Sequence, residues 1–431
     1  MMNRRNFLKK STLAAAAPWV VPSSVLGANS PSNQITLGFI GMGGQGKGRN
    51  LKGFITQDRV QVLAVCDCDQ TRAKQAKKIV DKTYQNKDCA MYQDFRELLA
   101  RDDLDGIVIS TPDQWHVPMS LMALEAGKHV FCEKPSLTIT EGRDLVTAFA
   151  AKDRVFQWGI EDRSLAKYHW LAGWARSGLL GEVYEVNCTL PKHEPFKRED
   201  PVAVPKNLDW NLWLGPAPFV DYTPSALDMF HWRLNSDYGG GMLTDWGTHL
   251  CDTGQIGLGF DSTGPVEAFG KCRELDPKVW NTDTPVDFEV TLKYANGAQM
   301  HVSDSSTYKE LLLEFKGTDG WVKCTGWYGV LEASDREILR TRTFGPEANY
   351  WPQPKVEHED FIDAIVAGHK ETAYHPEAGH RLCSALHLGH LALREGRTVG
   401  WDPLTESFTT DKAANEASVI YRRQARDWES A

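Results

Sequence analysis

The sequence predicts an α/β Rossmann domain with a parallel sheet, followed by an α+β domain with a mainly antiparallel sheet. Two observations carry this prediction. Between residues 35 and 158, short apolar runs alternate with helical patterns, and the first run ends in a glycine-rich turn. After residue 159 the alternation stops, and several segments show apolar and polar residues at period two. Strands separated by helices imply parallel pairing, whereas period-two strands are typical of half-buried antiparallel sheets.

The elements of the first domain can be expected in chain order. Strands are predicted at 35–40, 60–65, 106–110, 129–132 and 155–158, and helices at 46–55, 72–84, 94–99, 118–126 and 140–151. Gly127 suits a helix C-cap, and Thr138 or Thr140 suits an N-cap. In the second domain we expect strands at 183–190, 286–294, 299–303, 311–315 and 321–325, and a mostly helical tail over 357–429.

Length and composition agree with two globular domains, which we expect at residues 33–158 and 159–431. The chain has 431 residues, of which 42% are hydrophobic and 24% charged, so it can bury a sizeable core. Its net charge of −9 argues against nucleic acid or anionic lipid as a partner.

The first 28 residues have the order of a twin-arginine export signal. Arg4 and Arg5 precede an apolar stretch over 13–21, and small residues follow at Gly27 and Ala28. The alternative is an ordinary basic N-terminus. The apolar stretch is too short for a membrane span, and no later segment reaches the ~18 apolar residues that a span needs. We therefore expect an exported protein, periplasmic or envelope-associated, with no transmembrane segment in the mature chain.

The cysteine pattern points to neither a disulfide framework nor a zinc site. The chain has nine cysteines, an odd number, and no CxxC pair. Such cysteines are expected to be small buried hydrophobic residues, and no metal site is predicted.

A dinucleotide site is predicted where the first strand ends. The turn contains GxGxxG at Gly41, Gly43 and Gly46, with Met42 inside it. These glycines allow a tight turn, close approach to a pyrophosphate, and close packing of the helix on the sheet. Asp67 ends the second strand, where a carboxylate accepts the ribose hydroxyls of NAD and repels the 2′-phosphate of NADP. The alternative is a glycine-rich turn with a surface aspartate.

Two clusters are candidates for chemistry. Lys134 follows the fourth strand, at the edge where doubly wound sheets bind ligands, although it would also suit a surface position at a proline turn. Asp245 and His249 are four residues apart, so in a helix they would share one face, and the carboxylate could orient a proton-accepting imidazole. A metal pair or a structural ion pair is the alternative, and we see no convincing third metal ligand.

Further motifs carry a resemblance to a known family. They are Thr111-Pro112-Asp113-Gln114-Trp115-His116, Gly127-Lys128-His129-Val130 and Glu133-Lys134-Pro135, beside the glycine turn, Asp67 and the DxxxH pair. With these, nearly everything after residue 34 resembles the Gfo/Idh/MocA oxidoreductases, named for glucose–fructose oxidoreductase and inositol dehydrogenase. The segments 208–210, 213–218 and 400–403 look like a subgroup common among exported members.

The resemblance implies an open second sheet that often serves oligomerisation, so we expect a homo-oligomer. It also implies residue roles. Lys134 would contact substrate and nicotinamide, His249 would move the hydroxyl proton, and Asp245 would orient His249 or bind a hydroxyl. Arg163 would reach cofactor or substrate. The residues that would line the cofactor are Thr111, Pro112, Trp115, His116 and Glu133.

The expected function is NAD(P)-dependent oxidation or reduction of a sugar, polyol or related carbohydrate. Asp67 favours NAD, with NADP less favoured, and because a periplasm offers no pool of free NAD, we expect the cofactor to be tightly bound. One alternative is a redox-neutral glycosidase that acts through a 3-keto intermediate. Relatives of that type do not usually keep the lysine that stands at Lys134. The other alternative is a non-catalytic protein that binds sugar or NAD, against which Lys134, Asp245 and His249 together argue.

Overall fold

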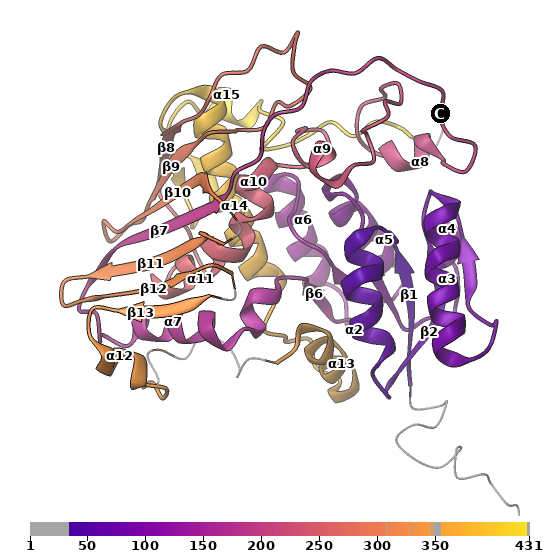
Figure 1. Ribbon diagram of the computed structural model, residues 1–431, viewed down its shortest axis with the longest axis horizontal. Helices are drawn as coiled ribbons and strands as arrows, with labels where there is room; N and C mark the ends of the chain where they lie inside the picture. Colours follow the sequence, from indigo (N-terminus) through magenta and orange to yellow (C-terminus); the bar gives the residue numbers. More distant parts are fainter. Residues whose placement is uncertain (1–33, 308, 328, 346–347, 349–354, 429–431) are drawn as a thin grey trace, which may run out of the picture.

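The computed structural model describes residues 34–428, apart from 308, 328, 346–347 and 349–354. Two sheets organise the molecule and stand side by side, with the parallel sheet on the right of Figure 1 and the larger sheet on the left. The predicted fold class is thereby confirmed: a Rossmann domain precedes a domain with a mostly antiparallel sheet. The predicted export signal at 1–28 lies outside the described residues.

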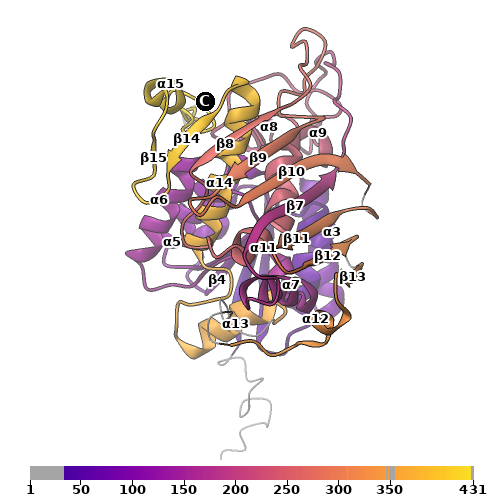
Figure 2. The same ribbon diagram turned by 90° about the vertical axis from the view of Figure 1, so that its left-hand side faces the viewer.

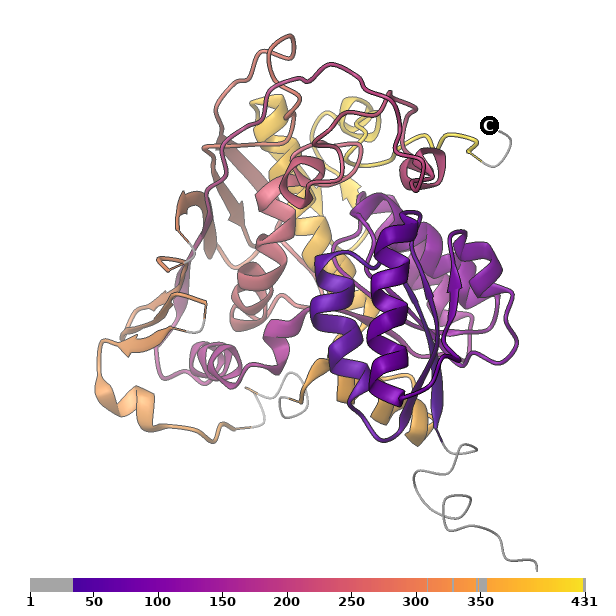
Figure 3. The same cartoon turned by 45° about the vertical axis from the view of Figure 1, so that its right-hand side comes forward.

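The first domain has six parallel strands in the order β3-β2-β1-β4-β5-β6. Figure 3 shows α2 and α3 on the near face of this sheet. Its elements are β1 (Ile35–Ile40), the π-helical turn η3 (Gly46–Asn50), α2 (Leu51–Ile55), β2 (Val60–Cys66), α3 (Gln70–Tyr84), β3 (Ala90–Tyr92), α4 (Phe95–Leu99), β4 (Gly106–Ile109), the 3₁₀ turn η4 (Asp113–Trp115), α5 (His116–Glu125), β5 (His129–Cys132), α6 (Ile139–Ala150) and β6 (Phe156–Trp158).

The second domain holds a nine-stranded sheet in the order β13-β12-β11-β7-β10-β9-β8-β14-β15, in which only the β7–β10 pair is parallel. Figure 2 looks onto its broad outer face, with α11 and α14 behind it. Its elements are η5 (Glu161–Ser164), α7 (Ala166–Arg176), β7 (Val183–Pro191), α8 (Trp210–Leu214), α9 (Met229–Arg233), α10 (Gly241–Asp245), α11 (Gly247–Gly257), β8 (Glu267–Lys271), β9 (Glu289–Lys293), β10 (Gln299–Ser306), β11 (Leu312–Gly317), β12 (Trp321–Thr325), β13 (Val330–Ala333), α12 (Arg336–Arg340), α13 (Glu357–Ala367), α14 (Pro376–Glu395), β14 (Val399–Asp402), β15 (Ser407–Phe408) and α15 (Lys412–Glu416).

Capping residues explain where several helices begin. Asp69 accepts a hydrogen bond from the Thr71 amide, so α3 starts two residues before the prediction. Thr138 accepts from the Glu141 amide and is the N-cap of α6. Strand β3 was not predicted, because three residues are too few to show a period.

Helix α13 returns from the second half of the chain to the Rossmann domain, at the foot of the molecule in Figure 1. Phe361 and Ile362 are fully buried in one apolar cluster with Phe54 and Phe131. The C-terminal part of the chain therefore completes the core of the first domain.

The carboxyl ends of the parallel strands lie under the segment that carries α8 and α9, at the top of Figure 1. The indole nitrogen of Trp115 donates to the backbone oxygens of Leu212 and Trp213 in α8, at 3.1 Å each. This contact joins the two domains at the sheet edge where doubly wound folds bind ligands. Within the described part of the chain, the helices are too short or too polar to cross a membrane.

Candidate active site

The glycine turn after β1 has two glycines that the fold itself requires. Gly41 has φ of +87°, and a Cβ there would lie 2.6 Å from the Ser110 backbone. A Cβ on Gly46 would lie 2.0 Å from the Gly41 carbonyl oxygen. Gly43 differs, because its Cβ would meet nothing nearer than 3.9 Å. Packing does not explain Gly43, and this glycine lines the cleft described below.

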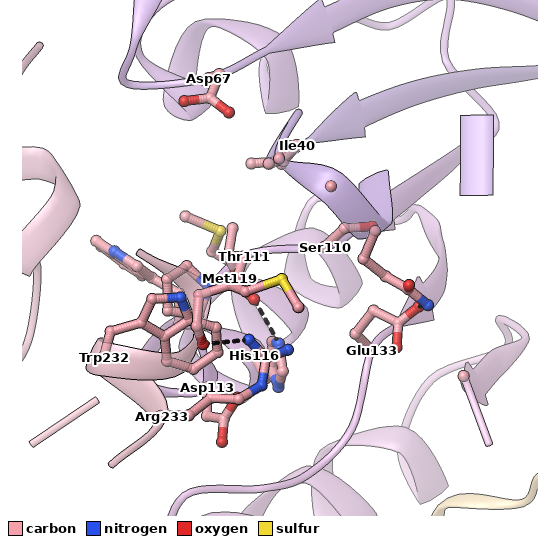
Figure 4. A pocket seen from close by; sticks show the side chains of 18 of the residues that line it. Ile40, Asp67, Ser110, Thr111, Asp113, His116, Met119, Glu133, Trp232 and Arg233 are labelled. Carbon is pink, nitrogen blue, oxygen red and sulfur yellow. Dashed lines mark hydrogen bonds between the residues drawn. The ribbon is translucent and has the colours of Figure 1, made fainter. Parts of the chain in front are cut away.

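Asp67 stands at the end of β2 and closes this end of the site. Its Oδ2 accepts the Met42 amide at 2.6 Å, and its Oδ1 accepts the Asp69 amide at 2.8 Å. Burial raises the pKa of the Asp67 carboxyl, while the two amide hydrogen bonds oppose that shift. Figure 4 shows the carboxylate at one end of the pocket, far from Arg233 and Asp113.

The loops after β4 and β5 are tied together by His116. One ring nitrogen lies 2.8 Å from the Pro135 oxygen and the other 2.9 Å from the Thr111 oxygen. Burial lowers the pKa of His116, while the two carbonyl oxygens oppose that shift. Both ring nitrogens are engaged by backbone carbonyls, so His116 holds the two loops of the pocket wall together.

Glu133, directly after β5, links this strand to the first helix. Its Oε1 accepts from the side-chain amides of Gln45, at 2.9 Å, and Asn50, at 2.8 Å. Asn50 also donates to the Ser110 hydroxyl at 2.8 Å. The end of β5 is thus fixed to the helix that follows the glycine turn.

Lys134 reaches across to the second domain. Its Nζ donates to the Asp245 backbone oxygen at 2.6 Å and to Asp245 Oδ1 at 2.8 Å. Asp245 Oδ2 lies 3.0 Å from Arg233 Nε. Although burial favours the neutral acid, Arg233 and Lys134 hold the pKa of the Asp245 carboxyl below its ordinary value.

His249 forms a buried dyad with Asp162. Its Nδ1 pairs with Asp162 Oδ2, and Asp162 Oδ1 accepts the indole N–H of Trp327 at 2.7 Å. Burial opposes ionisation of Asp162, but the neighbouring His249 and these hydrogen bonds keep the pKa of its carboxyl below the usual range. An ionised Asp162 fixes the proton on Nδ1, which leaves Nε2 as the proton acceptor.

This geometry corrects the expected role of Asp245. The prediction placed Asp245 and His249 on one face of a continuous helix, with the carboxylate orienting the imidazole. The structure breaks the segment at Trp246, so Asp245 ends α10 while His249 lies in α11. Asp162 orients the imidazole instead, and Asp245 holds Lys134 and Arg233.

Arg163 also departs from its expected position. Its guanidinium pairs with Asp252 at 2.6 and 2.7 Å and donates to the Ala373 oxygen at 2.7 Å, and it does not line the cleft. The tight turn η5 sends Glu161 to the cleft and Arg163 toward α11. Sequence reasoning missed Asp162, although this segment follows β6 at the ligand-binding edge of the sheet.

A cleft of about 570 Å³ joins these groups between the two domains. Figure 4 shows part of its wall, from Asp67 past His116 to Arg233. Met42 and Gly46 do not line the cleft. They support the glycine turn, Met42 through its amide hydrogen bond to Asp67 and Gly46 through its close approach to the Gly41 carbonyl oxygen. The predicted site residues that line it are Gly41, Gly43, Asp67, Thr111, Pro112, Trp115, His116, Glu133, Lys134, Asp245 and His249.

Comparison with known proteins gives two family matches. A model described as an oxidoreductase family NAD-binding Rossmann fold matches residues 35–160. A second, described as an oxidoreductase family C-terminal alpha/beta domain, matches residues 194–430. Both descriptions carry the Gfo/Idh/MocA name.

Among curated relatives, a glycosyl hydrolase family 109 protein of Shewanella pealeana is 36% identical over 162 residues, which are 32% of this chain and 35% of the relative. The match thus spans about a third of that protein. Among solved structures, the WlbA dehydrogenase from Chromobacterium violaceum, in complex with NADH and UDP-GlcNAcA, has a TM-score of 0.64 at 20% identity, covering 86% of this chain and 96% of that one. A putative myo-inositol dehydrogenase from Sinorhizobium meliloti has a TM-score of 0.57 at 20% identity, covering 85% and 99%. At these identities the structural likeness concerns the fold.

Proposed function

The chain belongs to the Gfo/Idh/MocA oxidoreductase family, with its NAD-binding Rossmann fold, and from this premise we propose that it moves a hydride between a bound nicotinamide dinucleotide and a hydroxyl or carbonyl of a sugar or polyol. One observation carries the proposal. A single cleft has a dinucleotide cradle at one end and, at the other, a histidine oriented for proton transfer beside a lysine. Oxidation of an alcohol needs both a hydride acceptor and a proton acceptor.

The residues present fit a dinucleotide. Gly43 leaves open space where a Cβ would project, and the helix that begins with η3 follows immediately, so its N-terminal amides can face a pyrophosphate. The Asp67 carboxylate suits the ribose hydroxyls of NAD and opposes the extra phosphate of NADP. When bound, the nicotinamide supplies hydride acceptance and donation; we propose NAD, held tightly.

The protein's own groups supply proton transfer and position. His249 Nε2 makes no hydrogen bond within the described part of the chain, and His249 lines the cleft. It accepts the hydroxyl proton in oxidation and returns it in reduction. The Lys134 ammonium, held by Asp245, stabilises negative charge as it develops on the substrate oxygen.

A redox-neutral glycosidase is the second candidate, and the family 109 relatives favour it. Such an enzyme would oxidise C3 of a glycoside, eliminate the aglycone, add water and return the hydride. The same His249 and Lys134 would serve the first step. Lys134 favours the oxidoreductase, because glycosidase-type relatives do not usually keep this lysine.

One experiment separates these functions. Native mass spectrometry first tests whether purified protein carries a dinucleotide, and single-turnover absorbance then follows NADH with polyols, aldoses and aryl glycosides. NADH that accumulates with a free sugar or polyol supports the oxidoreductase. Aglycone release without net NADH supports the glycosidase. Full activity of His249→Ala in both readouts would remove the basis of the catalytic assignment.

We also propose export through the twin-arginine route to the periplasm or envelope, and a homo-oligomer in solution. The export proposal rests on the sequence of residues 1–28. Changing both Arg4 and Arg5 to lysine should leave the protein in the cytosol, because the export receptor reads this pair. Cell fractionation tests this, and an unchanged location would contradict it.

A further inference from the structure

A second cavity, of about 460 Å³, lies beside the active-site cleft. Apart from Asn281, its lining comes from residues 192–240, the part of the chain between β7 and α10. Figure 1 shows this segment, with α8 and α9, above the carboxyl ends of the parallel strands. Trp232 of α9 lines the cleft and the second cavity, so the two spaces share a wall.

Trp232 connects this wall to the charged groups at the substrate end of the cleft. The Arg233 guanidinium lies over the Trp232 ring, 4.1 Å from its centroid, and Arg233 Nε lies 3.0 Å from Asp245 Oδ2. Asp245 in turn holds the Lys134 ammonium at 2.8 Å. Figure 4 shows Trp232 and Arg233 on the same side of the pocket. The second cavity is therefore adjacent to the end of the cleft where the substrate reacts.

Aromatic side chains form much of the second cavity. Trp210, Trp232 and Tyr238 are buried and belong to one apolar cluster. Trp210 stacks on Trp213, with ring centroids 4.7 Å apart, and its indole nitrogen donates to the Val220 oxygen at 2.8 Å. These contacts fix the rings in place. Fixed aromatic faces can pack against the C–H groups of a sugar ring with little loss of side-chain freedom.

Polar groups with no partner of their own also line the second cavity. Within the described part of the chain, the Tyr238 hydroxyl and the side-chain amides of Asn235 and Asn281 donate no hydrogen bond. His231 Nδ1 is buried and has no partner there either, while the ring stacks on Phe196 with centroids 4.2 Å apart. Hydroxyl, amide and imidazole groups match the hydroxyls of a sugar, which both donate and accept hydrogen bonds.

The charged residues of this lining do not favour an ionic ligand. Lys197 and Arg198 are exposed, and so are Glu199 and Asp221, so both signs of charge occur on the solvent side. Glu199 also accepts a hydrogen bond from the Ser225 hydroxyl at 2.6 Å. The cavity is therefore suited to a ligand that is bound through its ring faces and hydroxyls.

From these observations we propose that the second cavity is a subsite for a second sugar unit, so that the protein acts on a disaccharide or a longer glycoside. One ring would lie in the cleft against Lys134 and His249. The next would lie beyond Trp232, with the glycosidic bond passing the edge of the indole. This inference rests on the proposed function and deepens it, because hydride transfer takes place in the cleft while the second cavity selects the length of the substrate.

The test compares disaccharides with methyl glycosides, using protein that carries its bound dinucleotide. Maltose and trehalose are matched with methyl α-glucoside, cellobiose with methyl β-glucoside, and lactose with methyl β-galactoside. Each pair shares a non-reducing ring and its linkage configuration and differs in the second ring. Calorimetry gives affinities, and single-turnover absorbance gives the rate of NADH formation. We expect at least one disaccharide to bind about tenfold more tightly than its methyl glycoside, the size expected from one or two hydrogen bonds.

Two small changes assign this preference to the second cavity. Tyr238→Phe removes only a hydroxyl and Asn281→Ala removes only an amide group, and each should lower the ratio of disaccharide to methyl-glycoside affinity about threefold or more. Tyr184→Phe is the matched control, because Tyr184 is exposed on β7 and lines neither space, and it should leave the ratio unchanged. Melting temperatures show that each variant is folded.

The outcomes separate the subsite from the proposed chemistry. Equal or weaker binding of every disaccharide, or an unchanged affinity ratio in both cavity variants, would overturn the inference. Single sugars that reduce the dinucleotide without any preference for disaccharides would leave the proposed function standing and remove the subsite. Disaccharides that bind preferentially, with neither NADH formation nor cleavage, would contradict the proposed hydride transfer and leave the subsite established.

Discussion

Replacing Asp162 with asparagine isolates the step on which the proposed chemistry depends. The side chain keeps its size, so the pocket should keep its shape. Asp162 is fully buried, and Oδ2 pairs with His249 Nδ1 while Oδ1 accepts Trp327 at 2.7 Å. The amide removes the charge that stabilises a protonated imidazole, and it can present an N–H to Nδ1. In that arrangement Nε2 carries the proton and cannot accept another.

The magnitude follows from two contributions. A hydrogen bond to a charged group contributes about 1.5–3 kcal/mol, which corresponds to roughly 10- to 150-fold in rate. The wrong tautomer removes the base itself, and a general base contributes about 10²–10⁴-fold. We therefore expect the rate of NADH formation in a single turnover to fall about 10²–10³-fold in Asp162→Asn, with dinucleotide affinity near wild type. The pH profile of the rate should also move to lower pH.

Asp252→Asn is the matched control, because this buried aspartate lies on the same helix as His249 but pairs with Arg163. It should lower the melting temperature while the folded protein keeps its single-turnover rate. Trp327→Phe should have an intermediate effect, below tenfold, since it removes one neutral donor from Asp162. If Asp162→Asn keeps at least half of the rate and an unshifted pH profile, the dyad does not orient the base.

Three further changes test the cofactor cradle and the fold. Asp67→Ala should relax the preference for NAD over NADP, measured as the ratio of dissociation constants, and tighter binding of NADP by wild type would contradict the assigned role of Asp67. Gly43→Ala should keep the melting temperature, since the nearest atom would lie 3.9 Å from the new Cβ. The same change should weaken dinucleotide binding. Unchanged dinucleotide affinity would mean that the dinucleotide binds elsewhere. Burial lowers the pKa of His390 from its ordinary value of 6.5 to about 3. Below pH 6.5 the unfolded chain therefore binds a proton that the folded protein does not, and the folded protein loses stability as the pH falls toward about 3. His390→Leu should therefore flatten the fall in melting temperature between pH 6.5 and 4, and an unchanged acid limb would show that other groups control it.

Local signals were enough to predict that the glycine turn and Asp67 lie together, and both line one end of the cleft. The glycine turn, the strand before it and Asp67 lie within 33 residues, and each is constrained by its immediate neighbours. Gly41 and Gly46 meet each other across one turn, and Asp67 holds the Met42 amide. Such short-range geometry leaves its mark on residue types at fixed spacing.

The substrate end depends on contacts between distant segments, which spacing does not reveal. Asp162 and His249 are 87 residues apart, and Lys134 and Asp245 are 111 apart. The i, i+4 relation between Asp245 and His249 is a rule for a continuous helix, and the chain breaks its helix at Trp246. Lys134, Asp245 and His249 all line the cleft, but the partner of the imidazole was assigned from sequence proximity when tertiary packing decides it.

The site is assembled by the docking of the domains, and the ion pairs across it resist its opening. Lys134 comes from the Rossmann domain and is 8% exposed, while Asp245 comes from α10 and is 9% exposed. Opening the cleft would break this ion pair, whose charged atoms lie 2.8 Å apart and are both largely buried. The glycine turn, the lysine and the imidazole are therefore held in place before any substrate enters. Catalysis in such a site draws on charges that need little rearrangement during the reaction, which is the condition under which electrostatic stabilisation is most effective.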